Sequence, residues 1–186
     1  NAYLTVGSNT IVEKMSNPLS NQLSKMNRDN VPADGGNFLL SRHEVEEIVD
    51  KYPHARQYFK PYCGSIEFIR GLQRFYLWIE QSEIDDANAI PQLAKRVEQL
   101  IKFRQKNQAP SAHAIKSKFI ESSSAQRMNF IVPRVSSENR EYVPTGLLPE
   151  NAVVADSAMA LYDAPLWNMA IIASKLHLMW IATVCG

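Results

Sequence analysis

The chain has 186 residues, of which 45% are hydrophobic and 21% are charged, and its formal net charge is +1. The composition is that of an ordinary globular protein, and the length allows one domain with a real core, alone or with an extended arm. Cys63 and Cys185 are the only cysteines, and no Cys/His cluster accompanies them, which argues against a disulfide framework and a structural zinc site. Nothing resembles a secretory signal, so we expect a cytoplasmic protein.

Positive charge is concentrated in one part of the chain. Residues 95–140 contain ten Lys or Arg residues against three acidic ones, a net charge of +7, so the remainder carries −6. A basic band within a near-neutral chain indicates an anionic partner, and nucleic acid is the first candidate. The alternative is a solvated helix face that binds nothing.

The first forty residues predict an extended arm. Asn, Pro and Gly punctuate residues 1–40, so we expect neither a helix nor a sheet there. Asp34-Gly35-Gly36 predicts a tight turn, because a phosphate-binding loop would need a strand before it and a helix after it. An arm of this kind needs another surface on which to lie.

The next elements are helices with a strand between them. Ser41 and Glu44 have the spacing of a capping box, which predicts a helix over 42–52. Pro53 ends that helix or opens a second short one through Tyr62. Aromatic residues predict a strand over 74–79.

A long helix is predicted over 86–107, from apolar residues spaced three or four apart. Its last turn is rich in Lys and Arg, which complement the helix dipole whatever else they do. The basic residues of this turn and of the segment after it are candidate phosphate contacts: Lys102, Arg104, Lys106, Lys116 and Lys118.

The most polar stretch joins two predicted strands, over 128–135 and 140–144. It contains the side chains of Arg134, Ser136, Ser137, Glu138, Asn139 and Arg140. Arginine and asparagine pair with base edges, whereas serine and backbone amides suit phosphates. On a strand, Glu138 and Arg140 would point the same way. The alternative is that these residues only satisfy the turn and one another.

The last third predicts two more strands, over 151–155 and 158–162, and a final helix over 165–184. This helix is apolar nearly all round, but Asn168, Lys175 and His177 interrupt it, which argues against a membrane span. A helix without a polar face needs cover on every side, and we expect missing parts of a larger protein to provide it.

Together these elements predict a mixed α/β (α+β) fold. We expect one largely antiparallel sheet that contains all five predicted strands. Three helices would cover the sheet, and the arm would wrap outside it. Periodicity alone does not predict the order of the strands.

Five blocks of the sequence occur in a characteristic order: DGGNFLLS, GSIEFIRGLQRFYLWIE, RVEQLIKFRQK, IVPRVSSENREYVPTGLL and SKLHLMWIATVCG. Together they resemble the target-recognition region of MmeI-like (type IIL/IIG) bacterial DNA methyltransferases. This restriction–modification class includes orphan and phage-defence relatives. The resemblance covers nearly the whole chain.

Three motifs carry most of the resemblance. The family's SSE-x-R before Tyr-x-Pro appears here as Ser136-Ser137-Glu138-Asn139-Arg140 with Tyr142 and Pro144. Its Leu-Trp pair appears as Leu77-Trp78. The pattern of its last helix appears as Ser174, Lys175, His177 and Trp180. The chain departs from the family at Ala173, where a second serine is usual, and at Ala182, where an arginine is usual.

The resemblance implies a domain organisation and a function. Residues 41–186 would form a DNA target-recognition domain, and residues 1–40 would link it to an adenine-N6 methyltransferase domain. The expected partners are double-stranded DNA and that methyltransferase domain, without a membrane. The expected DNA contacts are the residues of the polar stretch and the basic residues given above.

The chain itself shows no catalytic motif. Asn17-Pro18-Leu19 lacks the second proline and the aromatic residue of the NPPY-type motif that holds a flipped adenine. We therefore expect no catalytic, metal or cofactor site in this fragment, while the parent enzyme would use S-adenosylmethionine.

Two other functions stay open. One is a protein-interaction domain that docks onto the methyltransferase core without reading bases. The other is a hydrolase built on Ser137 with His177 or His113, although the serine lacks the G-x-S-x-G context.

Overall fold

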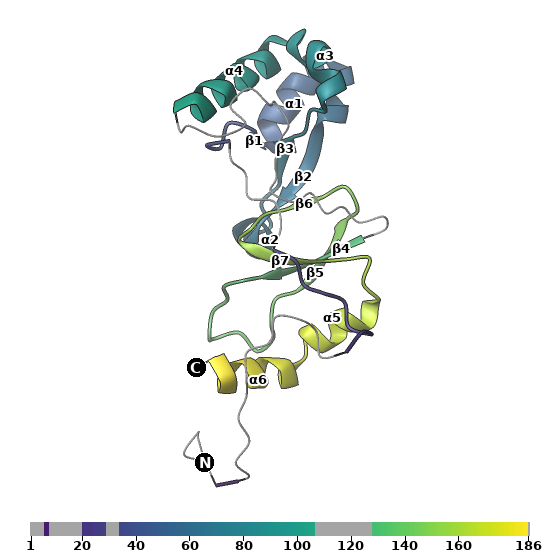
Figure 1. Ribbon diagram of the computed structural model, residues 1–186, viewed down its shortest axis with the longest axis vertical. Coiled ribbons are helices and arrows are strands. Elements are labelled where there is room, and N and C mark those ends of the chain that lie inside the picture. The colour runs from purple at the N-terminus through teal and green to yellow at the C-terminus, as the bar shows by residue number, and fades with distance from the viewer. Residues whose placement is uncertain (1–5, 8–19, 29–33, 107–127, 186) are drawn as a thin grey trace.

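The computed structural model describes residues 6–7, 20–28, 34–106 and 128–185. These residues form two lobes stacked along the long axis of the molecule, each built around its own β-sheet (Figure 1). The mixed α/β content and the mainly antiparallel pairing confirm the predicted fold class. The prediction of a single sheet is wrong, because the strands are divided between two sheets.

The upper lobe contains a four-stranded sheet with the order β1-β3-β2-β6. Its strands are β1 (Leu39–Ser41), β2 (Phe59–Cys63), β3 (Arg74–Leu77) and β6 (Val153–Val154). Strands β1 and β2 each pair antiparallel with β3, whereas β6 pairs parallel with β2. The helices of this lobe are α1 (Arg42–Lys51), η1 (Pro53–Tyr58), η2 (Gln81–Glu83), α3 (Ile84–Asn88) and α4 (Pro91–Lys106).

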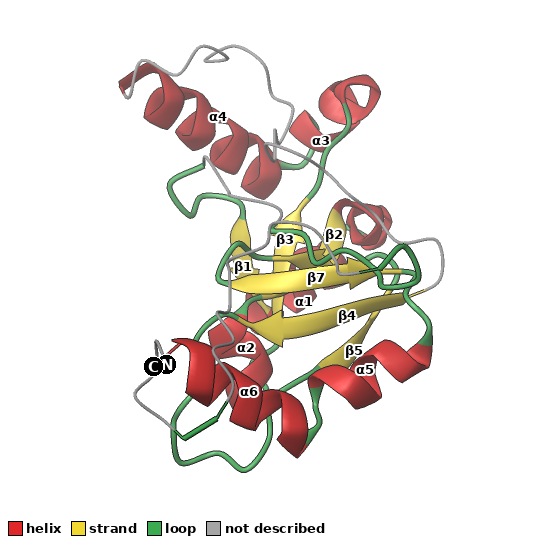
Figure 2. Cartoon of the chain, turned by 60° about the horizontal axis from the view of Figure 1, so that its bottom comes forward, coloured by secondary structure: helices red, strands yellow, loops and turns green. Residues whose placement is uncertain are grey.

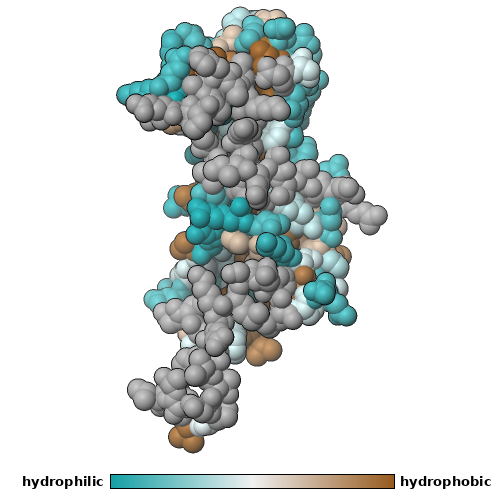
Figure 3. All heavy atoms as spheres, viewed as in Figure 1, coloured by the Kyte–Doolittle hydropathy of each residue, from teal (hydrophilic) through white to brown (hydrophobic). Residues whose placement is uncertain are grey.

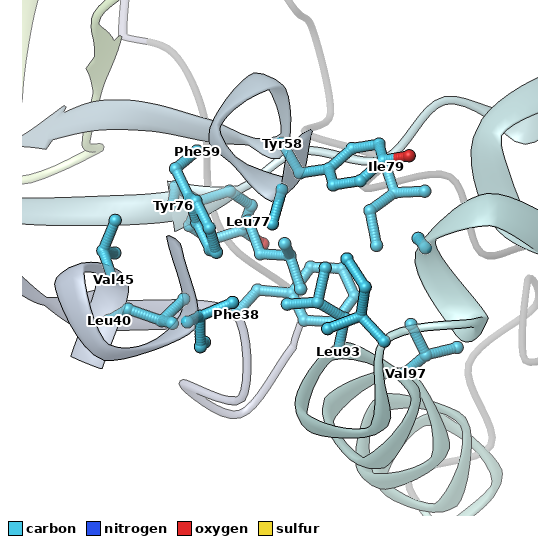
Figure 4. Packing of buried hydrophobic residues seen from close by; sticks show 14 of the residues in the cluster. Phe38, Leu40, Val45, Tyr58, Phe59, Tyr76, Leu77, Ile79, Leu93 and Val97 are labelled. Carbon is cyan, nitrogen blue, oxygen red and sulfur yellow. The ribbon is translucent and has the colours of Figure 1, made fainter. Parts of the chain in front are cut away.

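The upper core forms where the helices cover this sheet. Leu40, Tyr76 and Leu77 of the sheet meet Val45 of α1 and Leu93 of α4 there (Figure 4). The capping box predicted for α1 is present, since the backbone of Glu44 donates to the Ser41 hydroxyl and the Glu44 carboxylate accepts from Ser41. Local chemistry thus fixes the start of α1, and burial of its apolar face holds the helix against the sheet.

The lower lobe contains a three-stranded antiparallel sheet. Its strands are β4 (Met128–Pro133), β5 (Gly146–Pro149) and β7 (Ala158–Tyr162), and β4 lies between the other two (Figure 2). Alternate residues face opposite sides of this sheet. Phe130 and Leu161 pack toward the helix α5 (Leu166–Ile172), while Ile131 and Ala160 pack toward Phe68 of α2 (Ser65–Arg70).

The two lobes are joined where the start of α2 meets the turn between β6 and β7. The Ser65 amide donates to the Ser157 hydroxyl (3.1 Å), and the Ser65 hydroxyl donates to the Ser157 carbonyl oxygen. A Cβ on Gly64 would lie 2.6 Å from the Ser157 hydroxyl oxygen, so only glycine allows this approach. The chain therefore passes from one sheet to the other through a tightly packed turn.

The N-terminal arm was predicted to lie outside the sheets without joining them. Among its described residues, Asn27 forms an isolated antiparallel bridge with Ala160 of β7, and Leu39 and Leu40 belong to β1. The predicted tight turn at Asp34-Gly35-Gly36 is confirmed, because the Asp34 carboxylate accepts from the amides of Gly36 (3.0 Å) and Phe38 (2.8 Å).

One strand, β2, was not predicted, and another was predicted at the wrong residues. The second short helix offered as an alternative does begin at Pro53, but it ends at Tyr58 instead of Tyr62, and β2 follows. Proline is unusual inside a strand, so Pro61 argued against one here. The pairing of β2 with β6 begins only at Tyr62, so the missing N–H of Pro61 breaks no hydrogen bond to β6. The strand predicted over 140–144 is also wrong, since β5 begins only at Gly146, after Pro144.

Both long helices are divided. The helix predicted over 86–107 consists of α3 and α4, because Pro91 lacks an N–H and starts the second helix. The helix predicted over 165–184 consists of α5 and α6 (Lys175–Cys185), which meet at an angle (Figure 2). Here the Ser174 hydroxyl accepts from the His177 amide (3.1 Å), and the His177 ring donates to the Ile172 carbonyl oxygen (2.8 Å). None of the described helices is long and apolar enough to cross a membrane.

Candidate nucleic-acid interface

The predicted polar stretch is an exposed loop between β4 and β5. Every residue from Arg134 to Tyr142 is exposed, including the two serines expected to contact phosphate, Ser136 and Ser137. Ser137 begins a turn, because its carbonyl oxygen accepts from the Arg140 amide (3.2 Å) and its hydroxyl accepts from the Asn139 amide (3.2 Å). The loop therefore has a defined turn at its tip and presents polar groups to solvent.

Glu138 and Arg140 lie in this turn. The expectation that they point the same way from a strand is wrong, since neither residue belongs to a strand. No ion pair joins them within the described part of the chain. The reading in which they clamp the hairpin together therefore has no contact to support it. Both side chains are available to a partner.

Arg134, the first residue of the loop, is tied to the turn between the two sheets. Its amide donates to the Ser157 carbonyl oxygen (3.2 Å), and its guanidinium Nη1 donates to the Asp156 carbonyl oxygen (3.0 Å). The Asp156 carboxylate also lies 3.5 Å from Nη2 of Arg28. Sequence reasoning missed Arg28 and Asp156, because 128 residues separate them and no local motif contains either.

The basic residues of α4 divide into two groups. Lys102 and Lys106 are exposed, and Lys102 pairs with Glu98 one turn earlier (2.5 Å). Arg104 is only 3% exposed, so the prediction that it contacts phosphate is wrong for this arrangement. Lys116 and Lys118 lie outside the described residues.

Arg104 is buried because this face of α4 packs on residues 34–38. Phe103 fills the space above Gly35, where a Cβ would lie 2.6 Å from the ring. Asp34, which hydrogen-bonds to the Tyr76 phenol, and the Arg104 guanidinium both act on Tyr76, whose pKa burial raises far above its usual range. Arg104 thus opposes the effect of the buried Asp34 carboxylate on the Tyr76 phenol, and its buried position indicates a structural part.

Arg96, two turns earlier in α4, also stabilises the fold. Its guanidinium donates to the Asn37 carbonyl oxygen (2.8 Å) and pairs with Glu44 (2.6 Å). Much of the positive charge on α4 therefore holds the N-terminal turn and α1 in place.

Reactive side chains near the joint are held in unreactive states. Burial, with the nearby Glu67 carboxylate, raises the pKa of the Cys63 thiol to about 11, so the thiol stays protonated near neutral pH. Burial also raises the pKa of Tyr62 to about 12. Among the described residues no group of His, Cys, Asp and Glu could hold a metal ion.

The hydrolase alternative finds no support in the geometry. The Ser137 hydroxyl takes part in the turn of its own loop. The backbone nitrogen and the ring Nδ1 of His177 both form hydrogen bonds at the break between α5 and α6. No hydrogen bond joins the two residues within the described part. His113 lies outside it.

The main feature of the described surface is therefore an exposed polar loop between two strands of the lower sheet. Residues 6–186 match the family model described as MmeI, target recognition domain. The chain therefore belongs to this family, which confirms the resemblance found in the sequence.

Two relatives show how the domain is used elsewhere. The chain is 32% identical to DNA methyltransferase A of Bacillus subtilis (strain 168) over 187 residues, which cover 99% of this chain and 21% of that protein. It is also similar to the solved structure of the Type IIL restriction-modification enzyme MmeI in complex with DNA, with a TM-score of 0.83 and 28% identity. That match covers 98% of this chain and 25% of the other. The chain thus spans a quarter or less of either relative.

Replacing Arg104 with alanine should destabilise the fold. The change removes a buried guanidinium whose charge acts on the Tyr76 phenol against that of the Asp34 carboxylate, and a lost buried polar partner costs about 1–3 kcal/mol. Lys102→Ala is the matched control, because it removes an exposed pair on the same helix that contributes roughly 0.2–0.5 kcal/mol. Denaturant unfolding measures both variants. Equal stability of the two would contradict the structural role of Arg104.

Proposed function

We propose that this chain is the sequence-recognition domain of an S-adenosylmethionine-dependent adenine-N6 DNA methyltransferase. Such an enzyme would act in a cytoplasmic restriction–modification or phage-defence system. The domain binds double-stranded DNA and is not catalytic by itself. Residues 1–40 link it to the methyltransferase domain and end in β1 of the upper sheet, and residues 41–186 form the target-recognition domain.

The observation that carries this proposal is the exposed loop of residues 134–142 in a domain of the MmeI target-recognition family. Binding residues are often placed on loops held by a rigid scaffold, and β4 and β5 provide that scaffold here. The solved relative with the same fold was determined in complex with DNA.

The loop offers the chemistry needed to read bases. An arginine side chain forks onto the O6 and N7 atoms of guanine, and a glutamate accepts from the amino group of cytosine. Arg140 and Glu138 offer these two groups from the same exposed turn, and no ion pair joins them in the part of the chain that the structure describes. Ser136, Ser137, Lys102 and Lys106 suit the phosphates, whose contacts position the domain without carrying sequence information.

Replacing Arg140 with alanine should relax specificity at one base pair and leave the fold intact. A bidentate contact gives roughly 1–3 kcal/mol of discrimination between bases, whereas Arg140 makes no side-chain contact in the described structure that would stabilise it. The measurement is selection from a randomised duplex library by the wild-type chain and by the variant. A thermal melt is recorded beside each selection.

Arg56→Ala is the control, because Arg56 is an exposed arginine of η1 in the other lobe. It should select the same motif as the wild type. If the wild-type chain selects no motif at all, the proposed function is wrong. If Arg140→Ala loses its motif together with a marked fall in melting temperature, Arg140 is structural instead.

A second candidate function is protein docking, and an exposed apolar surface favours it. Large apolar side chains line the outer face of α5 and α6 and are 44–82% exposed: Leu166, Trp167, Ile171, Leu176, Met179 and Trp180. Exposed apolar side chains gathered on two successive helices indicate an interaction site. We propose that it packs against the methyltransferase core of the same polypeptide, which is compatible with DNA reading by the same domain.

Replacing both Leu176 and Met179 with glutamate tests this docking. The side chains are 82% and 57% exposed, so the isolated chain should melt nearly as the wild type does. Placed in the Bacillus subtilis methyltransferase instead of its matching region, the variant should fail to give a monodisperse enzyme by size-exclusion chromatography. Ile66→Glu on α2, 59% exposed on another face, is the control. Assembly of the double variant as well as this control would exclude docking through α6.

A further inference from the structure

Two arginines from distant parts of the chain converge on one residue at the boundary between the lobes. Arg28 comes from the N-terminal arm, Arg134 from the end of β4, and both contact Asp156 in the turn between β6 and β7. We propose that Arg28 and Arg134, held by Asp156, form a clamp for backbone phosphates of duplex DNA. This proposal rests on the proposed function and adds a phosphate site that includes the arm.

The backbone around Arg28 is fixed before the side chain reaches Asp156. The Asn27 amide donates to the Ala160 carbonyl oxygen (2.8 Å), and the Ala160 amide donates back to Asn27 (2.9 Å). Met26, the residue before Asn27, packs against the lower core. The arm is therefore attached to the edge of β7, and Arg28 starts from a defined position.

Arg134 is fixed in a different way. Its amide donates to the Ser157 carbonyl oxygen and its Nη1 to the Asp156 carbonyl oxygen, so the turn holds both its backbone and its guanidinium. Asp156 thus uses its carbonyl group for Arg134 and its carboxylate for Arg28. One residue therefore orients two guanidinium groups that are 106 positions apart in the sequence.

The charges in this cluster do not cancel. The cluster contains two guanidinium groups and one carboxylate, of which only Arg28 contacts the carboxylate, and the side chains of Arg28 and Asp156 are 55% and 34% exposed. A guanidinium has five N–H donors in a planar fork, and one donor of each arginine serves its contact to Asp156. The remaining donors are pre-oriented for an anion with several acceptor oxygens, for which phosphate is the best match.

Stability alone does not account for the cluster. An ion pair this exposed contributes about 0–1 kcal/mol, and the Arg28–Asp156 distance of 3.5 Å is long for a strong pair. Hydrophilic side chains gather near mid-height on this face of the molecule, over the lower sheet (Figure 3). Arg134 is also the first residue of the loop proposed to read bases. A phosphate held here would place that loop at the adjoining groove.

The test uses the whole chain and a duplex of random sequence, with affinity measured by fluorescence anisotropy across a range of salt concentrations. The variants are Arg28→Gln, Arg134→Gln and both together. Each lost phosphate contact should lower the slope of log K against log salt by roughly 0.9, and the double variant by about twice that. The motif selected from a randomised library should stay the same, because phosphate contacts carry no sequence information.

Arg42→Gln is the matched control. Arg42 is 61% exposed and pairs with Glu46 at 2.6 Å on α1, so it has the same chemistry in the other lobe. Its replacement should leave the slope unchanged. Inorganic phosphate, supplied at the phosphate concentration of the duplex, should compete poorly, because a single phosphate lacks its neighbours along a backbone.

Three results would overturn the clamp. An unchanged salt slope in Arg28→Gln and Arg134→Gln, with the wild type still selecting a motif, contradicts the clamp and leaves the proposed function standing. A fall in melting temperature of more than about 4 °C with an unchanged slope shows a structural tie instead. Absence of duplex binding by the wild type contradicts both proposals together.

Discussion

The arrangement of the molecule depends on the contact between Gly64-Ser65 and Ser157. At this point β6 of the upper sheet is followed, after one turn, by β7 of the lower sheet. The paired serines and the missing side chain of Gly64 lock the turn against α2. The same turn supplies the carbonyl groups that hold Arg134 and the carboxylate that holds Arg28. One packed turn therefore sets both the angle between the lobes and the position of the candidate DNA contacts.

The basic band shows how one kind of charge serves two purposes. Arg96 holds the N-terminal turn and α1, and Arg104 is buried, whereas Lys102 and Lys106 face solvent on the same helix. A count of charges along the sequence adds these groups together, although only exposed charges contribute to the field that a partner meets. The net positive charge that this band presents to solvent is therefore smaller than its total of +7.

The sequence predicted the elements whose signals are local. The capping box of Ser41 and Glu44, the strand at 158–162 and the turn at Asp34 each depend on residues a few positions apart, and all three are present. The division into two sheets could not be predicted, because it depends on β6 pairing with β2, some ninety residues earlier, rather than with β7. Register and strand choice of this kind follow from tertiary packing, which periodicity does not contain.

The same limit applies to the candidate site. The polar loop was visible as a dense run of donors and acceptors, but its shape was not, since Pro144 and the Ser137 turn postpone the return strand to Gly146. Burial of Arg104 was invisible because lysine and arginine look alike along a basic helix face. The meeting of Arg28 with Asp156 has no sequence signal, because the arm reaches it only through its bridge to β7.

The central claim is that this domain chooses the DNA sequence at which a methyltransferase acts. The most direct measurement replaces the matching region of Bacillus subtilis DNA methyltransferase A with this chain and determines, by single-molecule sequencing of DNA from cells that express the chimera, which sequence is methylated. Sequence reading by this chain predicts a methylated motif that differs from the parent's and equals the motif the isolated chain selects. A chimera that still methylates the parent's own motif would contradict the claim.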